Sequence, residues 1–501
     1  MTTETAPAGP QAVTGKEYLL LINGQQVAPK SGEMLERRYP ANSDVTVARF
    51  AKASEEDVDA AIQAARGAFD NGSWSKAPAR NRASVLRRAA DKIRSEQNDL
   101  ARLLASEVGK PLSEAGIEVA LTSDVFDYYA GLALDIKGQV VSNYVDDAIG
   151  LILKEPIGVI GIITPWNFPM LLATWKIAPA LAVGCTVVVK PASYTPCTTY
   201  ELGRILNESG APAGVVNVVT GSGKTVGDRI ASSHLVDKVA FTGSTEVGQQ
   251  VMRAAAGNVK KISLELGGKS PNVIFADANM QGAVIGALFG IYMNAGQVCQ
   301  AGSRLLVEES VHDQFLNMFS NFVAGVKVGD PMDPATRMGP VVSDAQLDTV
   351  ESYVKAGNDE KATLVRGGKR LTGEGYDKGY FYEPTIFDQV DNRMKIAQEE
   401  IFGPVLSVIP FKDADEALRL ANDTMYGLAA AVWTKDIDRA FKFAKGIKAG
   451  TVWINSYHAA GTLGVPLMPF GGYKQSGIGR ELGQEGMELF METKSVSLKL
   501  N

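Results

Sequence analysis

One cysteine has the surroundings expected of a nucleophile. Cys299 lies on a short loop, residues 294–304, between an Ala-rich apolar segment, 279–293, and the apolar run 305–307. The first segment predicts a helix and the second a strand, so the thiol would be held rigidly while the loop amides stay free to donate hydrogen bonds. The alternative is that Cys299 is a small buried hydrophobic residue, the ordinary role of an unpaired cysteine.

The thiol of Cys299 needs an activating group. Only a thiolate attacks well, and a free thiol with a pKa near ~8.5 is mostly protonated at pH 7. None of the three histidines is close to Cys299 in the sequence, which gives no support to a Cys–His pair. The three cysteines have no CxxC spacing, so we predict neither a disulfide framework nor a metal site.

Glycines and polar residues follow three predicted strands in the first half of the chain. These stretches are 190–193 (Lys-Pro-Ala-Ser), 220–224 (Thr-Gly-Ser-Gly-Lys) and 241–248 (Phe-Thr-Gly-Ser-Thr-Glu-Val-Gly). Gly243 and Ser244 stand at the start of a predicted helix, where backbone amides and the helix dipole favour a phosphate. The pattern is not GxGxxG, so taken alone it leaves a plain turn as an alternative to a cofactor site.

The elements that position these loops alternate regularly. From residue 158 to 265, strands are predicted at 158–163, 186–190, 215–219, 238–242 and 261–265, with helices at 169–182, 198–207, 225–232 and 245–255. This alternation is typical of a parallel sheet covered on both faces, which binds ligands beyond the carboxyl ends of its strands.

A second alternating set follows Cys299. Strands are predicted at 305–307, 386–387, 404–410, 429–433 and 451–454, with helices at 311–324, 345–356, 414–421 and 438–445. The chain therefore holds two α/β domains, and a cleft between them would bring a dinucleotide to the thiol. Before these sets, the sequence predicts a hairpin at 18–27, helices at 58–69, 80–107 and 119–134, and strands that leave the main body at 139–153 and 493–500.

Composition limits the class of partner. The 501 residues are 45% hydrophobic and carry a net charge of -6 without a long basic run, which argues against nucleic acid or an anionic membrane as a partner. The longest apolar region, 156–189, is interrupted by prolines and by Lys176, so no membrane span is expected. Residues 1–15 are typical of a disordered tail rather than a targeting signal, and the low cysteine content favours a reducing compartment, the cytoplasm.

Five segments, in order along the chain, resemble motifs of the aldehyde dehydrogenase superfamily. They are 165–169 (Pro-Trp-Asn-Phe-Pro), 264–270 (Leu-Glu-Leu-Gly-Gly-Lys-Ser), 296–299 (Gly-Gln-Val-Cys), 399–404 (Glu-Glu-Ile-Phe-Gly-Pro) and 469–477 (Pro-Phe-Gly-Gly-Tyr-Lys-Gln-Ser-Gly). The resemblance implies NAD(P)-dependent oxidation of an aldehyde to a carboxylic acid through a thiohemiacetal and a thioester on the cysteine.

The same resemblance implies an α/β fold with a Rossmann-like parallel-sheet cofactor domain, an α/β catalytic domain and a small β extension for assembly. It favours a homodimer or a dimer of dimers. The expected boundaries are a tail at 1–15, a dinucleotide-binding domain at 16–138 and 157–267, oligomerisation strands at 139–156 and 487–501, and a catalytic domain at 268–486.

By resemblance, five residues would take part in the chemistry. Cys299 would be the nucleophile and Glu265 the general base, while Asn167 and the Cys299 amide would stabilise the oxyanion. Lys176 and Glu481 match a pair that relays protons in the family, although an ion pair with a purely structural role remains open. The alternative for Glu265 is a surface carboxylate at a strand end. A retained Glu265 favours water over coenzyme A as the acyl acceptor.

The resemblance also assigns a cofactor site. Lys190 would bind the adenosine ribose, Ser244 the pyrophosphate and Glu400 the nicotinamide ribose, with Phe402 near the ring. The further residues expected there are Ile163, Thr164, Pro165, Trp166, Ser193, Gly223, Lys224, Phe241, Gly243 and Leu266.

Ser193 departs from the pattern of NAD-preferring relatives, which commonly carry a glutamate at this position. A serine lacks the charge that repels a 2′-phosphate, so we expect NADP to be accepted alongside or ahead of NAD. Lys224 in the next loop would add a positive charge, unless it is simply solvated.

The positions that match the family's substrate tunnel are mostly apolar. They are Phe168, Leu172, Trp175, Met293, Val298, His458 and Phe470. No arginine is among them, so medium-chain aliphatic or aromatic aldehydes are favoured over a carboxylate-bearing substrate. The alternative is that some of them only pack the core. The segment 457–468 departs from the common family pattern, which leaves this wall of the tunnel undefined.

Two other classes of function remain open. A thiol esterase or thioesterase could use Cys299, Glu265 and Asn167 without a redox role, but would not need Glu400 and Lys190. A non-catalytic binding protein on the same fold would need none of them. Absorbance of the reduced nicotinamide, with a panel of aldehydes and both cofactors, separates these classes.

Overall fold

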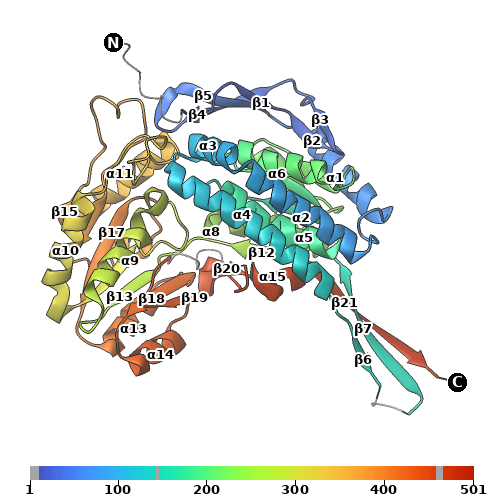
Figure 1. Cartoon of the computed structure of the whole chain (residues 1–501). Helices are drawn as coiled ribbons and strands as arrows, with labels where there is room; N and C mark the ends of the chain where they lie inside the picture. The colour runs from blue at the N-terminus through green and yellow to red at the C-terminus, as the bar shows by residue number, and fades with distance from the viewer. Residues whose placement is uncertain (1–10, 143–145, 459–465, 501) are drawn as a thin grey trace, which may run out of the picture.

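The computed structural model describes residues 11–142, 146–458 and 466–500. Two large sheets, of eight and seven strands, are flanked by helices, and a small sheet projects from the body beside the C-terminus (Figure 1). The predicted α/β alternation thus gives one large sheet on each side of the Cys299 loop.

The eight-stranded sheet is built around parallel strands that are mostly buried. Its order is β20-β12-β11-β8-β9-β10-β2-β3, with β20 and the β2–β3 hairpin antiparallel at its edges. The strands are β2 (Leu20–Ile22), β3 (Gln25–Val27), β8 (Val159–Ile163), β9 (Thr186–Lys190), β10 (Val216–Val218), β11 (Lys238–Thr242), β12 (Lys261–Glu265) and β20 (Gly477–Ile478). The helices that belong to this part of the chain are α1 (Glu55–Asp70), α2 (Ala79–Ser95), α3 (Gln97–Val108), α4 (Leu112–Leu132), α5 (Pro169–Val183), α6 (Pro196–Glu208), α7 (Asp228–Ser232) and α8 (Thr245–Ala255).

The register of this sheet places the predicted polar loops at one edge. Ile163 pairs with Lys190, Phe241 with Ile163, and Thr242 with Glu265, so β8, β9, β11 and β12 end side by side. The loops that follow these strands therefore share the edge where parallel sheets bind ligands.

The seven-stranded sheet is parallel except at one edge. Its order is β15-β16-β17-β14-β13-β18-β19, and β15 is antiparallel to β16. The strands are β13 (Pro271–Ile274), β14 (Arg304–Glu308), β15 (Thr363–Arg366), β16 (Thr385–Asp388), β17 (Val405–Phe411), β18 (Ala429–Trp433) and β19 (Thr451–Ile454). The helices are α9 (Met280–Tyr292), α10 (His312–Ala324), α11 (Asp344–Asp359), α12 (Lys395–Gln398), α13 (Ala414–Asn422) and α14 (Ile437–Gly446), while α15 (Gly483–Glu488) contacts α5 of the other part.

Two three-stranded sheets complete the fold. One joins β1 (Lys16–Tyr18), β5 (Asn42–Ala51) and β4 (Met34–Tyr39). The other joins β21 (Met491–Lys499), β7 (Ala148–Pro156) and β6 (Gln139–Val141), and it projects away from the helices (Figure 1). β21 pairs antiparallel with β7 from end to end. Val140 and Leu498 on this extension are more than half exposed, at 68% and 53%.

Two helix predictions are wrong in their bounds. The helix expected over 80–107 is broken at Glu96, which has φ −102° and ψ 12° and separates α2 from α3. The apolar spacing continues across this kink, so the pattern does not mark it. The helix expected at 119–134 begins earlier, at Leu112. The apolar spacing does not reveal its first turns, because Glu114 and Glu118 occupy positions on the face that is otherwise apolar.

The sequence analysis missed several strands. The longest are β4 and β5, and the most central is β13, which is only four residues long and begins with a proline. Short strands of this kind give too few alternations to show a period. Of the predicted tail, residues 1–10 lie outside the described part. Residues 11–15 have no regular structure, but the N–H of Val13 donates to the Ser106 hydroxyl at 2.9 Å.

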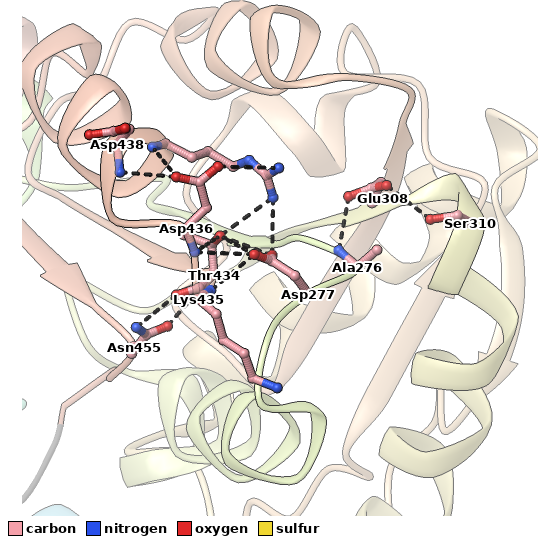
Figure 2. Close-up of polar contacts among 10 residues, drawn as sticks. Ala276, Asp277, Glu308, Ser310, Thr434, Lys435, Asp436, Asp438 and Asn455 are labelled. Carbon is pink, nitrogen blue, oxygen red and sulfur yellow. Dashed lines mark hydrogen bonds and ion pairs between the residues drawn. The ribbon is translucent and has the colours of Figure 1, made fainter.

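A polar network ties the ends of three strands of the seven-stranded sheet (Figure 2). The Asp277 carboxylate, just after β13, accepts hydrogen bonds from the Thr434 hydroxyl at 2.9 Å and the Arg439 guanidinium at 3.0 Å. It also accepts the N–H groups of Lys435 and Asp436. Asn455, just after β19, bonds the backbone of Thr434 in both directions at 2.9 Å. This network fixes where the chain leaves β19 toward Tyr457.

Within the described residues, no helix is long and apolar enough to cross a membrane. The domain boundaries inferred from the sequence stay predictions.

Candidate active site

The Cys299 loop begins with a tight left-handed turn. After α9, Asn294 and Ala295 have φ of 48° and 54°, values that L-residues adopt at a cost in energy. Gly296 follows with φ 76°, and a Cβ there would lie 2.1 Å from the carbonyl oxygen of Gly403. The loop is therefore packed directly against the 399–404 motif.

The Cys299 thiol is half-buried and surrounded by acidic groups. Burial raises its pKa above that of a free thiol, and the Glu400 and Glu265 carboxylates raise it further. Cys185 and Cys197 are fully buried. The resting side chain is therefore a thiol, and a base must remove its proton before attack.

Two glycines bring three motifs together. A Cβ on Gly268 would lie 2.4 Å from the Cys299 carbonyl oxygen, and one on Gly267 would lie 2.2 Å from the Glu400 carboxylate. The Gly268 N–H also donates to Glu400 at 3.0 Å. The loop after β12 thus contacts both the nucleophile and the 399–404 motif through its backbone.

Glu265 is the last residue of β12 and is only 3% exposed. The alternative of a surface carboxylate is therefore excluded. Among the described residues, neither carboxyl oxygen has a hydrogen-bond partner. Burial raises the pKa of Glu265 well above its usual range and Glu481 raises it further, while Lys176 and Arg480 act in the opposite direction. A buried carboxyl with both oxygens free can take or give a proton.

Lys176 and Glu481 form a buried ion pair with a 2.6 Å separation between Nζ and Oε1. Lys176 also donates to the Thr242 hydroxyl at 2.6 Å and to the Leu172 carbonyl at 3.3 Å. The pair lies close enough to Glu265 to influence its pKa. The geometry fits a proton relay and a structural ion pair equally.

Asn167 is tied to the nucleophile loop in both directions. Its Nδ2 donates to the Gln297 carbonyl at 2.9 Å, and its own carbonyl accepts from Asn294 Nδ2 at 3.1 Å. A carboxamide has two N–H donors, so the second remains for a substrate oxygen.

A cleft of about 720 Å³ contains almost all of the predicted cofactor residues. Cys299 and Asn167 also line it, whereas Lys224 does not. The predicted residues on its walls are Ile163, Thr164, Pro165, Trp166, Lys190, Ser193, Gly223, Phe241, Gly243, Ser244, Leu266, Glu400 and Phe402. The nucleophile and the polar strand ends thus open into one cavity.

The cleft has the donors that a dinucleotide needs. Ser244 caps α8, whose first turn presents free backbone amides. Among the described residues the buried Thr164 hydroxyl has no hydrogen-bond partner, and the Lys190 ammonium donates one hydrogen bond, to the Pro191 carbonyl at 3.0 Å. Burial lowers the pKa of Lys190 to about 8. Trp166 and Phe402 meet edge to face at 5.1 Å. No metal-binding group of three ligands occurs within 11–142, 146–458 and 466–500.

The residues predicted for the substrate tunnel lie outside this cleft. None of them lines this cleft, and Met293 lines a separate cavity of about 550 Å³ beside α9 and α10. Trp175 and Phe470 contact each other, with ring centres 5.1 Å apart, and the Lys110 ammonium lies 3.6 Å above the Phe168 ring. Phe168, Leu172, Trp175, Val298 and Phe470 are buried.

His458 lies near the nucleophile. Its Nδ1 is 3.1 Å from Gln300 Nε2, and the neighbouring Tyr457 hydroxyl donates to the Gln300 carbonyl at 2.7 Å. Burial lowers the pKa of His458 to about 3, so its ring is neutral. Most of the loop that departs from the family pattern, 459–465, lies outside the described residues.

Comparison with known proteins identifies the family. The Aldehyde dehydrogenase family profile matches residues 27–496. A betaine aldehyde dehydrogenase of Bacillus subtilis is 46% identical, covering 95% of this chain and 96% of the relative. The chain belongs to the aldehyde dehydrogenase family.

Solved structures agree with this assignment. A NAD-dependent aldehyde dehydrogenase from Sinorhizobium meliloti superposes with a TM-score of 0.94 at 42% identity, covering 97% of this chain and 95% of the other. The betaine aldehyde dehydrogenase of Staphylococcus aureus in complex with NAD+ gives a TM-score of 0.94 at 43% identity, covering 96% and 95%. The predicted family and α/β fold class are confirmed, and the protein is an aldehyde dehydrogenase.

The aldehyde dehydrogenase cleft also contains residues that sequence reasoning missed. Some stand inside the quoted loops and could have been included, whereas Gln346 and Thr349 come from α11 and had no signal. Gln346 donates to the carbonyls of Ile401 and Phe402 at 3.1 and 2.9 Å, which holds the 399–404 motif. The other unpredicted residues are Ala192, Tyr194, Thr242, Val247, Gly267 and Ile401.

Gly268 gives a direct test of this geometry. A methyl group added there would meet the Cys299 carbonyl at 2.4 Å, so Gly268→Ala must displace one of the two loops. We expect aldehyde oxidation to fall by about 100-fold or more, because an error of about 1 Å in a reacting group has that effect. Gly67→Ala in α1, away from the cleft, where a Cβ also meets nothing within 4 Å, is the matched control. Steady-state rates of both variants decide; full activity in Gly268→Ala contradicts the packing.

Proposed function

We propose that this aldehyde dehydrogenase oxidises apolar aldehydes to carboxylic acids, with Cys299 as nucleophile and NAD or NADP as hydride acceptor. The observation that carries the proposal is the meeting of the Cys299 loop, Asn167 and the glycines after Glu265 at one end of the cleft. The relatives support it, since one is named NAD-dependent and another was solved with NAD+.

The first step is attack on the aldehyde. Glu265, directly or through water, takes the proton from Sγ of Cys299, and the thiolate forms a bond to the carbonyl carbon while the π electrons move to oxygen. The second N–H of Asn167 and the Cys299 amide stabilise this oxyanion; one such donor contributes about 3 kcal/mol in other enzymes. The thiohemiacetal formed is held beside the cleft.

The cleft residues orient the hydride acceptor. When bound, the nicotinamide accepts the hydride that leaves the thiohemiacetal carbon, and a thioester on Cys299 remains. Glu400 would hold the adjacent ribose and Phe402 would support the nicotinamide ring, since both residues line the cleft and the Phe402 ring packs against Trp166. Lys190 would bind the adenosine ribose, and the N-terminus of α8 with its Ser244 cap would bind the pyrophosphate, because both line the same cleft.

The last step releases the acid. Glu265 removes a proton from water, the hydroxide attacks the thioester carbon, and the C–S bond breaks to return the thiolate of Cys299. Burial keeps the proton affinity of Glu265 high, so this carboxylate is a stronger base than a solvated glutamate. Lys176 and Glu481 lie next to it and can pass the proton onward.

The substrate class rests on the aromatic residues near Asn167. Phe168, Trp175 and Phe470 are buried and apolar. The Lys110 ammonium against Phe168 is already paired with Glu118, which leaves it unable to pair with a substrate carboxylate. Betaine aldehyde, named for two relatives, carries a quaternary ammonium that aromatic faces also bind. Here the Phe168 ring already holds the Lys110 ammonium on one face, which weakens its attraction for a second cation. We therefore place hexanal and benzaldehyde ahead of betaine aldehyde.

The cofactor preference rests on Ser193. Its hydroxyl donates to the Gly221 carbonyl at 3.0 Å, and the residue lines the cleft. No carboxylate stands at this position to repel a 2′-phosphate. We propose that NADP is accepted together with NAD. Lys224 is exposed and does not line the cleft, so its contribution stays a prediction.

Assembly is proposed to use the small sheet of β6, β7 and β21. Apolar residues such as Val140 and Leu498 are exposed on this projecting sheet, and they would be covered by another subunit. We expect a homodimer or a dimer of dimers. Light scattering at micromolar concentration tests this, and a monomer there contradicts it.

Cys299→Ala tests the function itself. With hexanal, benzaldehyde and betaine aldehyde, the wild type should produce reduced nicotinamide, measured by absorbance, with the highest kcat/KM for the first two. Cys299→Ala should lose this activity and any ester hydrolysis, while Cys185→Ala and Cys197→Ala, altered at fully buried thiols, should keep it if they fold. Ester or thioester hydrolysis by the wild type without reduction of either cofactor would favour a thiol esterase instead.

Glu265→Gln separates acylation from deacylation. The glutamine amide cannot activate water. If the main role of Glu265 is in deacylation, the variant should release up to about one equivalent of reduced cofactor per active site and then stall. Rapid mixing with a saturating aldehyde measures this burst. Steady turnover at the wild-type rate would place the base elsewhere.

Ser193→Glu tests cofactor choice. A carboxylate facing the 2′-phosphate should weaken NADP use by about 1 to 3 kcal/mol while leaving NAD use nearly unchanged. The ratio of kcat/KM values for the two cofactors is measured in wild type and variant. Ser193→Ala serves as the uncharged control. If Ser193→Glu leaves the ratio unchanged, this side chain does not face the ribose.

A further inference from the structure

Three glutamates in the segment 107–118 accept backbone N–H groups that have no local partner. Helices α5 and α6 both begin with a proline and have no side-chain hydrogen bond at the N-cap. Glu118 instead accepts the N–H groups of Met170 and Leu171 at 3.1 and 3.2 Å. Glu107 accepts those of Cys197 and Thr198 at 2.8 and 2.9 Å. Carboxylates from a distant segment thus cap both helices.

The third glutamate acts on the nucleophile loop. Glu114 Oε2 accepts the N–H of Asn294 at 2.9 Å. Asn294 and Ala295 are the left-handed residues that begin this loop. Such a conformation persists only where surrounding contacts fix it. The Glu114 carboxylate supplies one of these contacts.

From Asn294 the contacts reach the atoms proposed for catalysis. Asn294 Nδ2 donates to the carbonyls of Asn167 and Gln297 at 3.1 and 3.3 Å. Asn167 Nδ2 donates to the same Gln297 carbonyl at 2.9 Å. Gln297 is two residues before Cys299. A shift of Asn294 would therefore move the oxyanion donor and the thiol together.

Lys110 and Glu118 hold the other side of Asn167. Their side chains form a fully buried ion pair at 2.6 Å, and the Lys110 ammonium also lies 3.6 Å above the ring of Phe168, the residue after Asn167. Glu114 and Glu118 are four residues apart in α4, so they project from one face of the helix. That face contacts both the first turn of α5 and the turn before Cys299.

We propose that Glu114 is a positioning residue of this enzyme: by accepting the Asn294 N–H, it holds Asn167 and the Cys299 loop in their reactive geometry. This inference rests on the proposed function of Cys299 and Asn167. The acceptor oxygen at the right reach performs the role, and the negative charge is not required. Lys110 and Glu118 complete the support from the Phe168 side.

A pair of variants separates reach from charge. Glu114→Gln keeps the length of the side chain and an acceptor oxygen but removes the charge, whereas Glu114→Asp keeps the charge and shortens the reach by one methylene. We expect kcat within about threefold of wild type for Glu114→Gln and a loss of about tenfold or more for Glu114→Asp. KM for the aldehyde should change little in either variant.

Glu107→Gln and Glu107→Asp are the matched controls. Glu107 caps α6 by the same kind of contact and comes from the same segment, but it does not touch the Cys299 loop. These variants should show thermal midpoints lowered about as much as those of the Glu114 variants, with kcat close to wild type at saturating substrates. A structural role alone predicts parallel behaviour at the two positions.

Alkylation of Cys299 by iodoacetamide gives a readout that needs neither aldehyde nor cofactor. Only this cysteine is not fully buried, so the reaction reports on its loop even if Cys299→Ala were to retain oxidation and overturn the proposed function. A loop released from Glu114 exposes its thiol, so alkylation should be about threefold faster in Glu114→Asp and unchanged in the Glu107 variants. Wild-type kcat and alkylation in Glu114→Asp, or a loss in Glu114→Gln equal to that in Glu114→Asp, would overturn the inference.

Discussion

The active site depends on close contact between backbones of three loops. Gly268 lies against the Cys299 carbonyl, Gly267 against the Glu400 carboxylate and Gly296 against Gly403, at distances that leave no room for a Cβ. Two of these contacts are with main-chain carbonyls and the third is with the Glu400 side chain, so the chain path leaves little freedom in where the Cys299 loop and the Glu400 carboxylate lie. Placement of this kind suits a reaction in which a thiolate attacks one carbon and a hydride then leaves the same carbon, each in a defined direction.

The same close packing excludes water from the acidic side chains and so raises their pKa values. Burial raises the pKa values of Glu400 and Glu114 to about 7, and that of Glu265 well above its ordinary range. The Cys299 thiol responds in the same direction, since burial and these neighbours disfavour its negative charge. The resting Cys299 side chain therefore keeps its proton, and the Glu265 carboxyl binds a proton more tightly than a solvated glutamate does.

The sequence predicted the parts of the fold in which local pattern and burial agree. The central strands β8, β9 and β11 are mostly apolar, with polar residues at or directly after their ends at the cleft, so the sheet was predicted from pattern, and the residues that line the cleft were named from these strand ends and from the family resemblance. The residues predicted for the substrate tunnel stay predictions, because Phe168, Trp175 and Phe470 are buried outside the cleft, and an apolar side chain looks the same in the sequence whether it packs a core or faces a ligand. Gln346 and Thr349 enter the cleft from α11 by tertiary packing alone, which no local pattern encodes.

The start of α4 shows why local rules fail where a distant element completes a helix. A helix that begins with proline and lacks a capping side chain has no recognisable N-cap in its local sequence. The backbone N–H groups at the starts of α5 and α6 are nevertheless capped by Glu118 and Glu107, which lie tens of residues away in the chain. The same requirement puts Glu114 and Glu118 on the inner face of α4, which breaks the apolar spacing and hides the first turns of that helix. The buried charges near the active site and the misplaced helix boundary therefore have one cause. Carboxylates occupy core-facing positions there because the backbone N–H groups of α5, α6 and the Cys299 loop have no other acceptor.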